Sequence, residues 1–339
     1  MSKLSIIITA LNEQHELEPT LQSIKDTCGD AAEVIVVDDC SKEVQGSNIP
    51  NVKFIRNNER KGVGPSRHIG AEHAEGDYIL LTDAHMRFEP GWYEKAMERI
   101  VGRNSTVHCG ACLGLDESAM DLSKHKGVYT GATLLLHNPS TNEIFEGKWI
   151  PDKKDQDDYD IACVMGASYF FPKEFFFKIG GLKALKMWGS DEPYISLKAW
   201  RAGGDIKMMK SVRIGHKFRG AAPYSTWVPN IIYNKMRSIS TILEPDLTKI
   251  MMDKFPKSGD HQAALEMLAK EANIVQEERN YYDKLFVRDT KWLCDKFNIR
   301  YPEQPGNTPT RLHTVATGKP GVVRAIPAPP RVGQHMQTS

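Results

Sequence analysis

Short apolar runs rich in β-branched residues recur along the first hundred positions of the chain. Four of these runs have the length and composition of buried strands: residues 4–8, 34–37, 52–55 and 78–81. Between the first two runs, Leu17, Leu21 and Ile24 recur at helical spacing. Pro65 and Pro90 can each occupy the first turn of a further helix. Continuous apolar strands separated by helices predict an α/β fold with a doubly wound, mostly parallel sheet covered on both faces.

Beyond residue 100 the alternation of strands and helices is weaker. Residues 133–136 and 167–171 are predicted strands, and the polar stretch 152–160 is predicted to be a solvated loop. Residues 227–243 and 261–297 are predicted to be helical. The chain is therefore expected to divide into an α/β domain, a helical extension and a Pro-rich, disordered tail, over residues 1–243, 244–301 and 302–339.

The composition excludes several classes of protein. The 44 Lys and Arg residues balance the 43 Asp and Glu residues, so the 339-residue chain has a formal net charge of +1. Such a balance gives no whole-chain attraction to nucleic acid or to anionic membranes. No apolar run approaches the roughly 20 residues that span a bilayer, and six Cys residues are too few for a disulfide scaffold. We expect a soluble protein of a reducing compartment.

Polar residues follow three of the predicted strands. The segments are Thr9 to Glu13 after the first strand, Asp38 to Ser41 after the second and Asp83 to His85 after the fourth. Ligands of open parallel sheets bind at the carboxyl ends of the strands. The three segments therefore predict a functional site at this edge of the sheet.

Asp83 and His85 have the spacing of two ligands to one divalent cation. Mixed carboxylate and imidazole ligation suits Mn²⁺ and Zn²⁺, whereas Mg²⁺ prefers oxygen ligands alone. The alternative is an Asx-turn beside an exposed histidine. Neither a Walker-type loop nor a Gly-x-Gly-x-x-Gly motif follows the first strand, so a P-loop enzyme and a dinucleotide-dependent dehydrogenase are not favoured.

The motifs together resemble those of a GT-A fold, nucleotide-sugar-dependent glycosyltransferase. Residues 5–13, residues 36–41 and the Asp-x-His motif carry this resemblance. Three further segments resemble the polypeptide N-acetylgalactosaminyltransferases more narrowly: residues 59–71, Trp188-Gly189-Ser190-Asp191-Glu192, and Gly215-His216-Lys217-Phe218-Arg219 with Tyr224 downstream. Their order and approximate spacing hold from residue 4 to about 240. The resemblance implies a GT-A fold with a Rossmann-like nucleotide-binding half and a catalytic domain that ends near residue 243.

The resemblance also implies a metal centre and a donor site. Asp83, His85 and His216 would hold Mn²⁺, with Mg²⁺ as an alternative, against the diphosphate of a UDP-sugar. The implied residues around the nucleotide come from the first strands and the segment that follows them: Thr9, Ala10, Asn12, Asp38, Asp39, Arg60 and Arg67.

Further residues would surround the sugar and the leaving group. The resemblance places Gly166 and Ala167 along the sugar and Trp188 on the leaving-group side. Arg219 and Tyr224 would reach the diphosphate from a loop that can close over the donor and exclude water.

The reaction implied is retaining transfer of a GalNAc-, GlcNAc- or Glc-type sugar from UDP to a hydroxyl, with Ser or Thr of a protein as the best acceptor candidate. The segment ending in Asp191-Glu192 departs from the family's Trp-Gly-Gly-Glu-Asn. Its adjacent carboxylates also resemble inverting GT-A enzymes, in which Asp191 would act as the general base. The Gly-His-x-Phe-Arg match favours retention.

Alternatives remain for the acceptor and for the class of function. A hydroxylated base in DNA or a glycan could be the acceptor, and a nucleotide-sugar-binding protein or a nucleotidyltransferase could share the fold. The lectin domain and the membrane anchor of the family's animal members have no counterpart in the sequence, so we expect a cytoplasmic enzyme of a bacterium or a phage-infected cell. The sequence does not determine the oligomeric state.

Two other signals are interpreted as structural. Cys109 and Cys112 have zinc-like spacing, but no second pair follows and residues i and i+3 of a strand point to opposite faces, which favours buried thiols. Tyr281, Tyr282 and Trp292 are interpreted as core residues of the late helices rather than as a platform for sugar.

Overall fold

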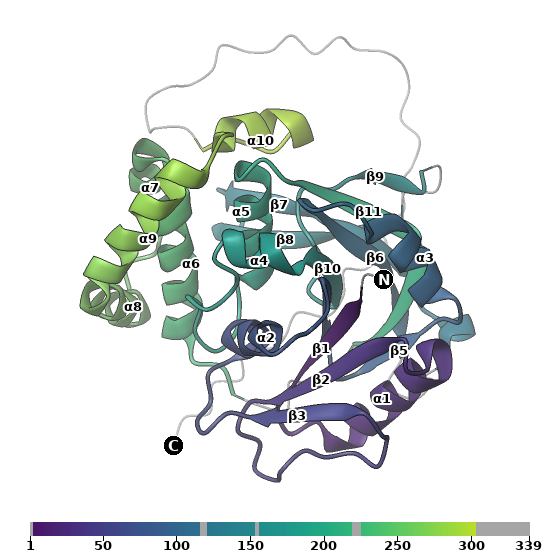
Figure 1. Cartoon of the computed structure of the whole chain (residues 1–339). Helices are drawn as coiled ribbons and strands as arrows, with labels where there is room; N and C mark the ends of the chain where they lie inside the picture. The colour runs from purple at the N-terminus through teal and green to yellow at the C-terminus, as the bar shows by residue number, and fades with distance from the viewer. Residues whose placement is uncertain (1–2, 116–120, 153–155, 219–224, 303–339) are drawn as a thin grey trace.

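The computed structural model describes residues 3–115, 121–152, 156–218 and 225–302. Its described part contains one mixed sheet with helices packed around it (Figure 1). The strands are β1 (Leu4–Ala10), β2 (Ala32–Asp38), β3 (Val52–Arg56), β4 (Tyr78–Asp83), β5 (Met86–Phe88), β6 (Thr106–Leu115), β7 (Val128–Asn138), β8 (Glu143–Pro151), β9 (Asp158–Asp160), β10 (Ser168–Pro172) and β11 (Asp205–Lys217). The helices are α1 (Gln14–Cys28), α2 (Val63–Glu72), α3 (Trp92–Ile100), η1 (Leu122–Lys124), α4 (Lys173–Lys178), α5 (Asp191–Arg201), α6 (Val228–Ile242), α7 (Pro245–Met252), α8 (Gly259–Lys270), α9 (Ala272–Leu285) and α10 (Thr290–Phe297).

The N-terminal half of the sheet has the predicted doubly wound arrangement. Its strand order is β3-β2-β1-β4, and all of these neighbours are parallel. The chain moves one way from β1 to β2 and the other way from β3 to β4, so right-handed connections place α1 and α2 on opposite faces. Figure 1 shows the two helices on either side of these strands. The strand order therefore reverses between β1 and β4, which is where ligands bind in sheets of this kind.

The second half of the sheet is more antiparallel. β10 pairs antiparallel with both β4 and β6, and β11 pairs parallel with β6 and antiparallel with β5. One local expectation was wrong: residues 158–160, predicted to lie in a solvated loop, form β9 on the edge of β11. Lys207 of β11 forms an ion pair with Asp160 at 2.6 Å, which explains how so polar a segment joins the sheet.

The predicted C-terminal helices are present, but the stretch 261–297 is divided. It forms α8, α9 and α10, because the helix changes direction at Glu271 and the chain is non-helical from Phe286 to Asp289. The helix α6, expected to belong to the α/β domain, packs against α8 and α9 as well as α5. Within the described residues, none of the helices combines the length and apolar character needed to cross a membrane.

A buried histidine on β6 should make the fold sensitive to acid. His108 is 4% exposed, and burial, followed by the nearby positive Arg103, lowers its pKa from 6.5 to about 4. In the unfolded chain the His108 imidazole binds a proton below about pH 6.5, whereas in the folded chain it does so only near pH 4. The stability contributed by neutral His108 is thus present above pH 6.5 and is lost as the pH falls toward 4. By linkage, the loss at pH 4 amounts to about 3 kcal/mol.

We expect His108→Gln to reduce this loss. Its free energy of unfolding should fall by about 3 kcal/mol less than that of the unsubstituted chain between pH 7 and pH 4, as measured by urea unfolding at each pH. The exposed His15 supplies the control, and His15→Gln should leave the pH dependence as it is. If the free energy of unfolding fell equally with pH in His108→Gln and in the unsubstituted chain, the prediction would be contradicted.

Candidate active site

Three predicted metal ligands meet at the edge where the strand order reverses. Asp83 ends β4 and lies opposite Thr9 of β1 in the strand register. His85 follows two residues later, and β11 brings in His216, whose backbone pairs with Met86 of β5. The ligand atoms of Asp83, His85 and His216 all lie within 4.8 Å of one another. Sheet pairing thus assembles a cluster in which Asp83 and His216 are 133 positions apart in the sequence.

The chemistry of this cluster fits a divalent cation. It offers one carboxylate and two imidazoles, a donor set that suits Mn²⁺ better than Mg²⁺. His216 Nδ1 is buried and has no hydrogen-bond partner among the described residues, while its Nε2 lies 3.5 Å from Asp83 Oδ2. The carboxylate of Glu13 lies 3.8 Å from His85 Nδ1, within ion-pair distance. Carboxylates beside ligating histidines commonly orient the imidazole ring.

Asp83 is held in its charged form. Burial opposes the charge, but the hydrogen bond to His216 and the positive charge of Arg67 outweigh it and keep the pKa of Asp83 well below its ordinary value. The guanidinium of Arg67 lies 2.8 Å from Asp83 Oδ1. The carboxylate is therefore ready to bind a cation at any physiological pH.

Arg67 lies behind the site rather than on its open side. The residue is 1% exposed, and its guanidinium also contacts Asp191 Oδ2 at 2.7 Å, the Gly166 carbonyl at 2.7 Å and the Tyr169 hydroxyl at 3.2 Å. These partners, together with Asp83, occupy both terminal nitrogens of Arg67, so its guanidinium faces carboxylates and a carbonyl of the protein; its contact with a nucleotide stays a prediction. Burial disfavours its charge, yet Tyr169 and the two carboxylates raise the pKa of Arg67 above its ordinary value.

The two aspartates predicted beside the nucleotide are tied to neighbouring loops. Asp38 accepts hydrogen bonds from Arg56 and from the Ser41 amide. Asp39 accepts bonds of 2.8 Å from the amides of Lys61 and Gly62. Both carboxylates are nearly buried. They shape the backbone at the ends of β2 and α2.

The other residues predicted around the nucleotide differ in exposure. Thr9 and Arg60 are half-buried and Ala10 is buried. Asn12 has a left-handed backbone (φ 57°), and its side chain accepts a hydrogen bond of 2.9 Å from the Lys42 amide. Asn12 therefore joins the ends of β1 and β2. Arg219 and Tyr224, predicted to reach the diphosphate, lie outside the described residues.

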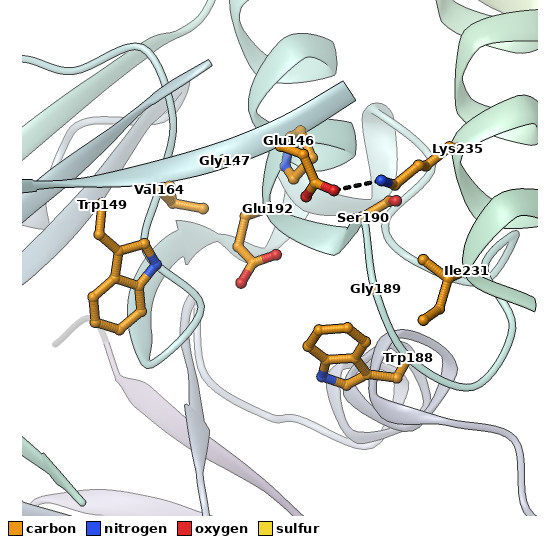
Figure 2. Close-up of a pocket in the computed structure, with 11 residues that line it drawn as sticks. Glu146, Gly147, Trp149, Val164, Trp188, Gly189, Ser190, Glu192, Ile231 and Lys235 are labelled. Atoms are coloured by element: carbon orange, nitrogen blue, oxygen red, sulfur yellow. Dashed lines mark hydrogen bonds and ion pairs between the residues drawn. The ribbon is translucent and has the colours of Figure 1, made fainter. Parts of the chain in front are cut away.

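A pocket of about 180 Å³ opens next to the metal cluster (Figure 2). Trp149 and Trp188 flank it, and the carboxyl group of Glu192 lies between the two indoles. The ring of Trp149 is 6.0 Å from that of His216, which places the pocket against the candidate metal site. An ion pair between Lys235 and Glu146 closes one side. Of these residues, Trp188 and Glu192 were expected from the sequence.

Trp149, Glu146 and Lys235 were not expected from the sequence. Trp149 and Glu146 lie on β8 and Lys235 on α6, which approach one another only after folding. No local motif marks these positions. The apolar and polar alternation of residues 143–151 could have predicted a strand, but not its neighbour.

The surroundings of Glu192 strongly disfavour its charged form. Burial, and then the neighbouring Asp191 carboxylate, raise its pKa well above the ordinary glutamate value. A methyl group at Gly166 would lie 2.2 Å from Glu192 Oε1. Gly166 thus makes room for this carboxyl group, and Ala167 beside it is buried. The predicted sugar-lining segment therefore supports the pocket through Glu192.

Gly166→Ala is expected to displace the Glu192 side chain from its place in the pocket. A flexible side chain can rotate away from the new methyl group, so the fold should keep its stability. Turnover of the sugar donor should fall about tenfold or more, because a displacement of about 1 Å in a site is costly. The measurement is UDP release and the thermal midpoint of the same samples. Gly127→Ala, where an added methyl meets nothing within 4 Å, is the control, and equal turnover in both variants would contradict the role of Gly166.

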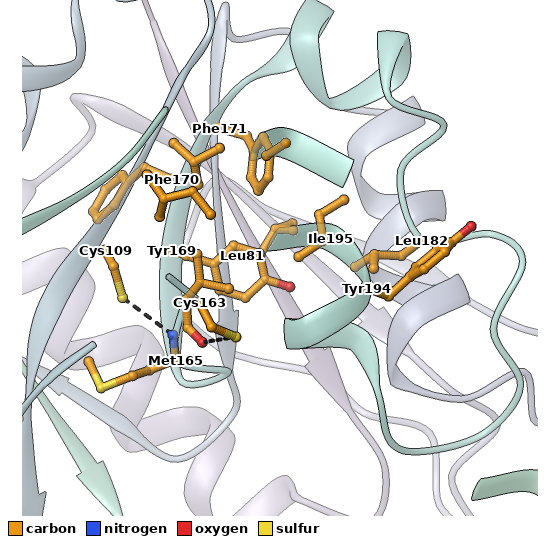
Figure 3. Close-up of a cluster of buried hydrophobic side chains, with 14 of the residues drawn as sticks. Leu81, Cys109, Cys163, Met165, Tyr169, Phe170, Phe171, Leu182, Tyr194 and Ile195 are labelled. Atoms are coloured by element: carbon orange, nitrogen blue, oxygen red, sulfur yellow. Dashed lines mark hydrogen bonds between the residues drawn. The ribbon is translucent and has the colours of Figure 1, made fainter. Parts of the chain in front are cut away.

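The signals interpreted as structural are partly confirmed. Cys109 and Cys112 are free, buried thiols, and burial raises the pKa of Cys109 to about 12. Figure 3 shows Cys109 within the apolar core, near Met165 and Phe170. Tyr282 is buried as expected, but Tyr281 and Trp292 are exposed over 47% and 38% of their surface, so the expectation that these two are core residues was wrong.

A doubly wound sheet with an Asp-His-His cluster at its switch point defines a GT-A type protein with a candidate metal centre. Comparison with known proteins gives the family. The model of glycosyl transferase family 2 matches residues 5–176, just over half of the chain, and the chain belongs to this family.

Relatives and a solved structure agree with this assignment. Polypeptide N-acetylgalactosaminyltransferase 5 of Rattus norvegicus is 25% identical over 280 residues, which cover 78% of this chain and 29% of the rat protein. Polypeptide N-acetylgalactosaminyltransferase 12 of Mus musculus is 26% identical over 324 residues, which cover 89% of this chain and 52% of the mouse protein. The chain spans about half or less of these relatives. The crystal structure of GalNAc-T7 with UDP, GalNAc and Mn²⁺ has a TM-score of 0.61 at 18% identity, covering 88% of this chain and 57% of that one, which shows the shared fold.

Proposed function

We propose that the chain is a Mn²⁺-dependent glycosyltransferase that moves a sugar from a UDP-sugar to a hydroxyl group with retention of configuration. The observation that carries the proposal is the cluster of Asp83, His85 and His216 at the switch point, with the pocket against it. The family, and relatives whose names state N-acetylgalactosamine transfer to polypeptides, support it. Bound Mn²⁺ would supply charge stabilisation to the departing diphosphate.

The residues of the pocket have distinct tasks in this proposal. The indoles of Trp149 and Trp188 offer apolar faces to a sugar ring and exclude water. Burial and the Asp191 carboxylate raise the pKa of Glu192, which favours its protonated form, and a protonated carboxyl group can donate a hydrogen bond to a sugar hydroxyl. Arg67 keeps Asp83 and Asp191 in place. Transfer breaks the bond from the anomeric carbon to the phosphate and forms one to the acceptor oxygen, whose proton leaves with the diphosphate.

The surroundings of the two adjacent carboxyl groups support retention. An inverting enzyme needs a carboxylate that can take the acceptor's proton. Asp191 is 5% exposed and its carboxylate is bound to the buried guanidinium of Arg67, so it has little access to an acceptor, and the raised pKa of Glu192 favours a protonated carboxyl group there. An inverting reaction with Asp191 as the base is therefore less well supported. Proton NMR of the first product tests this point, because a β-linkage from an α-linked donor would overturn it.

The proposed acceptor is Ser or Thr of a protein. A panel of UDP-GalNAc, UDP-GlcNAc and UDP-Glc, each with Mn²⁺, with Mg²⁺ and with EDTA, tests the donor and the metal through UDP release. Mass spectrometry of host material from co-expression then identifies the acceptor, with sugar on peptides expected and sugar on nucleosides or glycans contradicting the proposal. UDP-sugar binding without UDP release would indicate a binding protein, and pyrophosphate release from a nucleoside triphosphate would indicate a nucleotidyltransferase. A cytoplasmic setting in a bacterium or phage-infected cell stays a prediction; the relatives named above are animal proteins.

A further inference from the structure

The segment that carries Trp188 into the pocket has a strained backbone. We call residues 186–190 the Trp188 loop. Met187 and Ser190 have left-handed conformations with φ of 54° and 69°, and Gly189 between them has φ of 103°. Side chains other than glycine rarely adopt this region, and such strain persists only where the surroundings over-determine the backbone. Contacts from outside the loop must therefore hold it.

Asn234 of α6 supplies these contacts on one side. The residue is fully buried, and its Oδ1 accepts a hydrogen bond of 2.8 Å from the Lys186 amide. Its Nδ2 lies 2.7 Å from the Lys186 carbonyl oxygen, 3.0 Å from that of Gly189 and 3.2 Å from that of Trp188. One carboxamide thus faces four backbone groups of the same loop. Only an amide side chain offers an acceptor and two donors at once in this space.

The loop before α2 holds the opposite side. The Met187 amide donates to the Lys61 carbonyl at 3.0 Å, and the Met187 carbonyl accepts from the Val63 amide at 2.8 Å. A methyl group at Gly62 would lie 2.0 Å from the Met187 carbonyl oxygen, so the two backbones are in close contact. The Trp188 loop is therefore clamped between α2 and α6.

The junction of α8 and α9, at Glu271, reinforces the α6 side. Lys186 forms an ion pair of 2.6 Å with Glu271. Glu271 also binds Arg237 at 3.0 Å and accepts a hydrogen bond from the Tyr233 hydroxyl. Both of these partners lie on α6, on either side of Asn234. The helical layer is therefore connected to the pocket through the first residue of the Trp188 loop.

We infer that Asn234 is a positioning residue that sets the place of Trp188 in the pocket by fixing the backbone of the Trp188 loop. The inference rests on the proposed function, because it takes the pocket to be the site of the sugar. It gives the helical layer a part in the reaction that sequence motifs did not assign. Asn234 itself does not line the pocket.

A double-mutant cycle with Trp188 tests the inference. Two variants remove the contacts of the carboxamide: Asn234→Ala, and the nearly isosteric Asn234→Asp, which places an oxygen where the amide donor faced the three carbonyls. Each should lower the rate of UDP release from the best donor about 100-fold, because a misplacement of about 1 Å in a site costs about that much. In the Trp188→Ala background, the same changes should lower it by less than about twofold, because the effect acts through Trp188. The affinity for UDP with Mn²⁺ should stay the same. Asn234→Asp keeps the test open if Asn234→Ala does not fold.

Thr241→Ala is the matched control. Thr241 is buried on the same helix, and its hydroxyl donates to the Arg237 and Ser238 carbonyls of that helix and to no other group among the described residues, so its loss should leave turnover unchanged. Equal losses for the Asn234 variants in both backgrounds, or an equal loss in Thr241→Ala, would overturn the inference and leave the proposed function standing. Full turnover in Trp188→Ala alone would contradict the proposed role of the pocket, and the inference with it.

Discussion

Asp83→Ala is expected to lower metal-dependent sugar transfer about 1,000-fold or more. Asp83 is the one carboxylate of the cluster, and its charge is held by His216 and Arg67. Bound metal supplies several kcal/mol of charge stabilisation to a departing group, and each 1.4 kcal/mol corresponds to a factor of ten in rate. The measurement is UDP release at saturating Mn²⁺ for the best donor, beside Mn²⁺ binding followed by electron paramagnetic resonance. Asp83→Ala should lose both UDP release and Mn²⁺ binding.

His85→Ala serves as the second variant, since it removes a ligand without affecting the pair between Asp83 and Arg67. Asp26→Ala, at an exposed position of α1, is the control and should behave like the unsubstituted chain. Normal Mn²⁺ binding by Asp83→Ala would contradict the metal assignment. Normal binding with lost turnover would instead place the role of Asp83 elsewhere in the site.

The parallel half of the sheet could be predicted because its signals are local. The strands β1, β2 and β4 each contain a continuous, buried apolar run, and buried parallel strands need no partner-specific pattern. The edge strand β9 depends instead on pairing with β11, which lies about 50 positions further along the chain. Its stabilising contacts, such as the ion pair of Lys207 with Asp160, are not visible in a single segment.

The cluster of candidate metal ligands could be predicted for a different reason. Asp83 and His85 share one motif, and the resemblance to a known family added His216. What could not be predicted is how buried charges are distributed behind these ligands. Arg67 was expected at the nucleotide, yet it is enclosed by Asp83, Asp191 and the Gly166 carbonyl. Burial and pairing of this kind depend on the packing of α2 against β10 and α5, which motif spacing does not encode.

The pocket likewise combines residues that belong to a motif with residues whose role depends on packing. Trp188 belongs to a motif, but Asn234, which holds its loop, is one polar residue in a helical pattern. A mid-helix asparagine has many possible explanations in sequence. Only the four backbone groups around its carboxamide show what it does.

Arg67→Met is expected to lower the free energy of unfolding by about 3–5 kcal/mol, because it leaves the partly buried carboxylate of Asp83 and the buried carboxylate of Asp191 without their cation. Methionine fills a similar volume, so the loss measures charge and hydrogen bonding more than packing. The affinity for Mn²⁺ should also fall about 10- to 100-fold, as it does when a residue behind a metal ligand is removed. Urea unfolding and Mn²⁺ titration measure the two effects on the same protein.

Two comparisons make the Arg67 prediction specific. Arg99→Met removes a surface arginine paired with Asp157 and Asp158 and should cost at most about 1 kcal/mol. Adding Asp191→Asn to Arg67→Met removes one of the two stranded carboxylates, so the double variant should be more stable than the single one. If Arg67→Met cost no more than Arg99→Met, or if Asp191→Asn lowered its stability further, the buried cation would not be what holds these two carboxylates together. If the double variant regained stability but still bound Mn²⁺ weakly, the two roles of Arg67 would be separable. Its pair with Asp191 would then contribute to stability, and its pair with Asp83 would support metal binding.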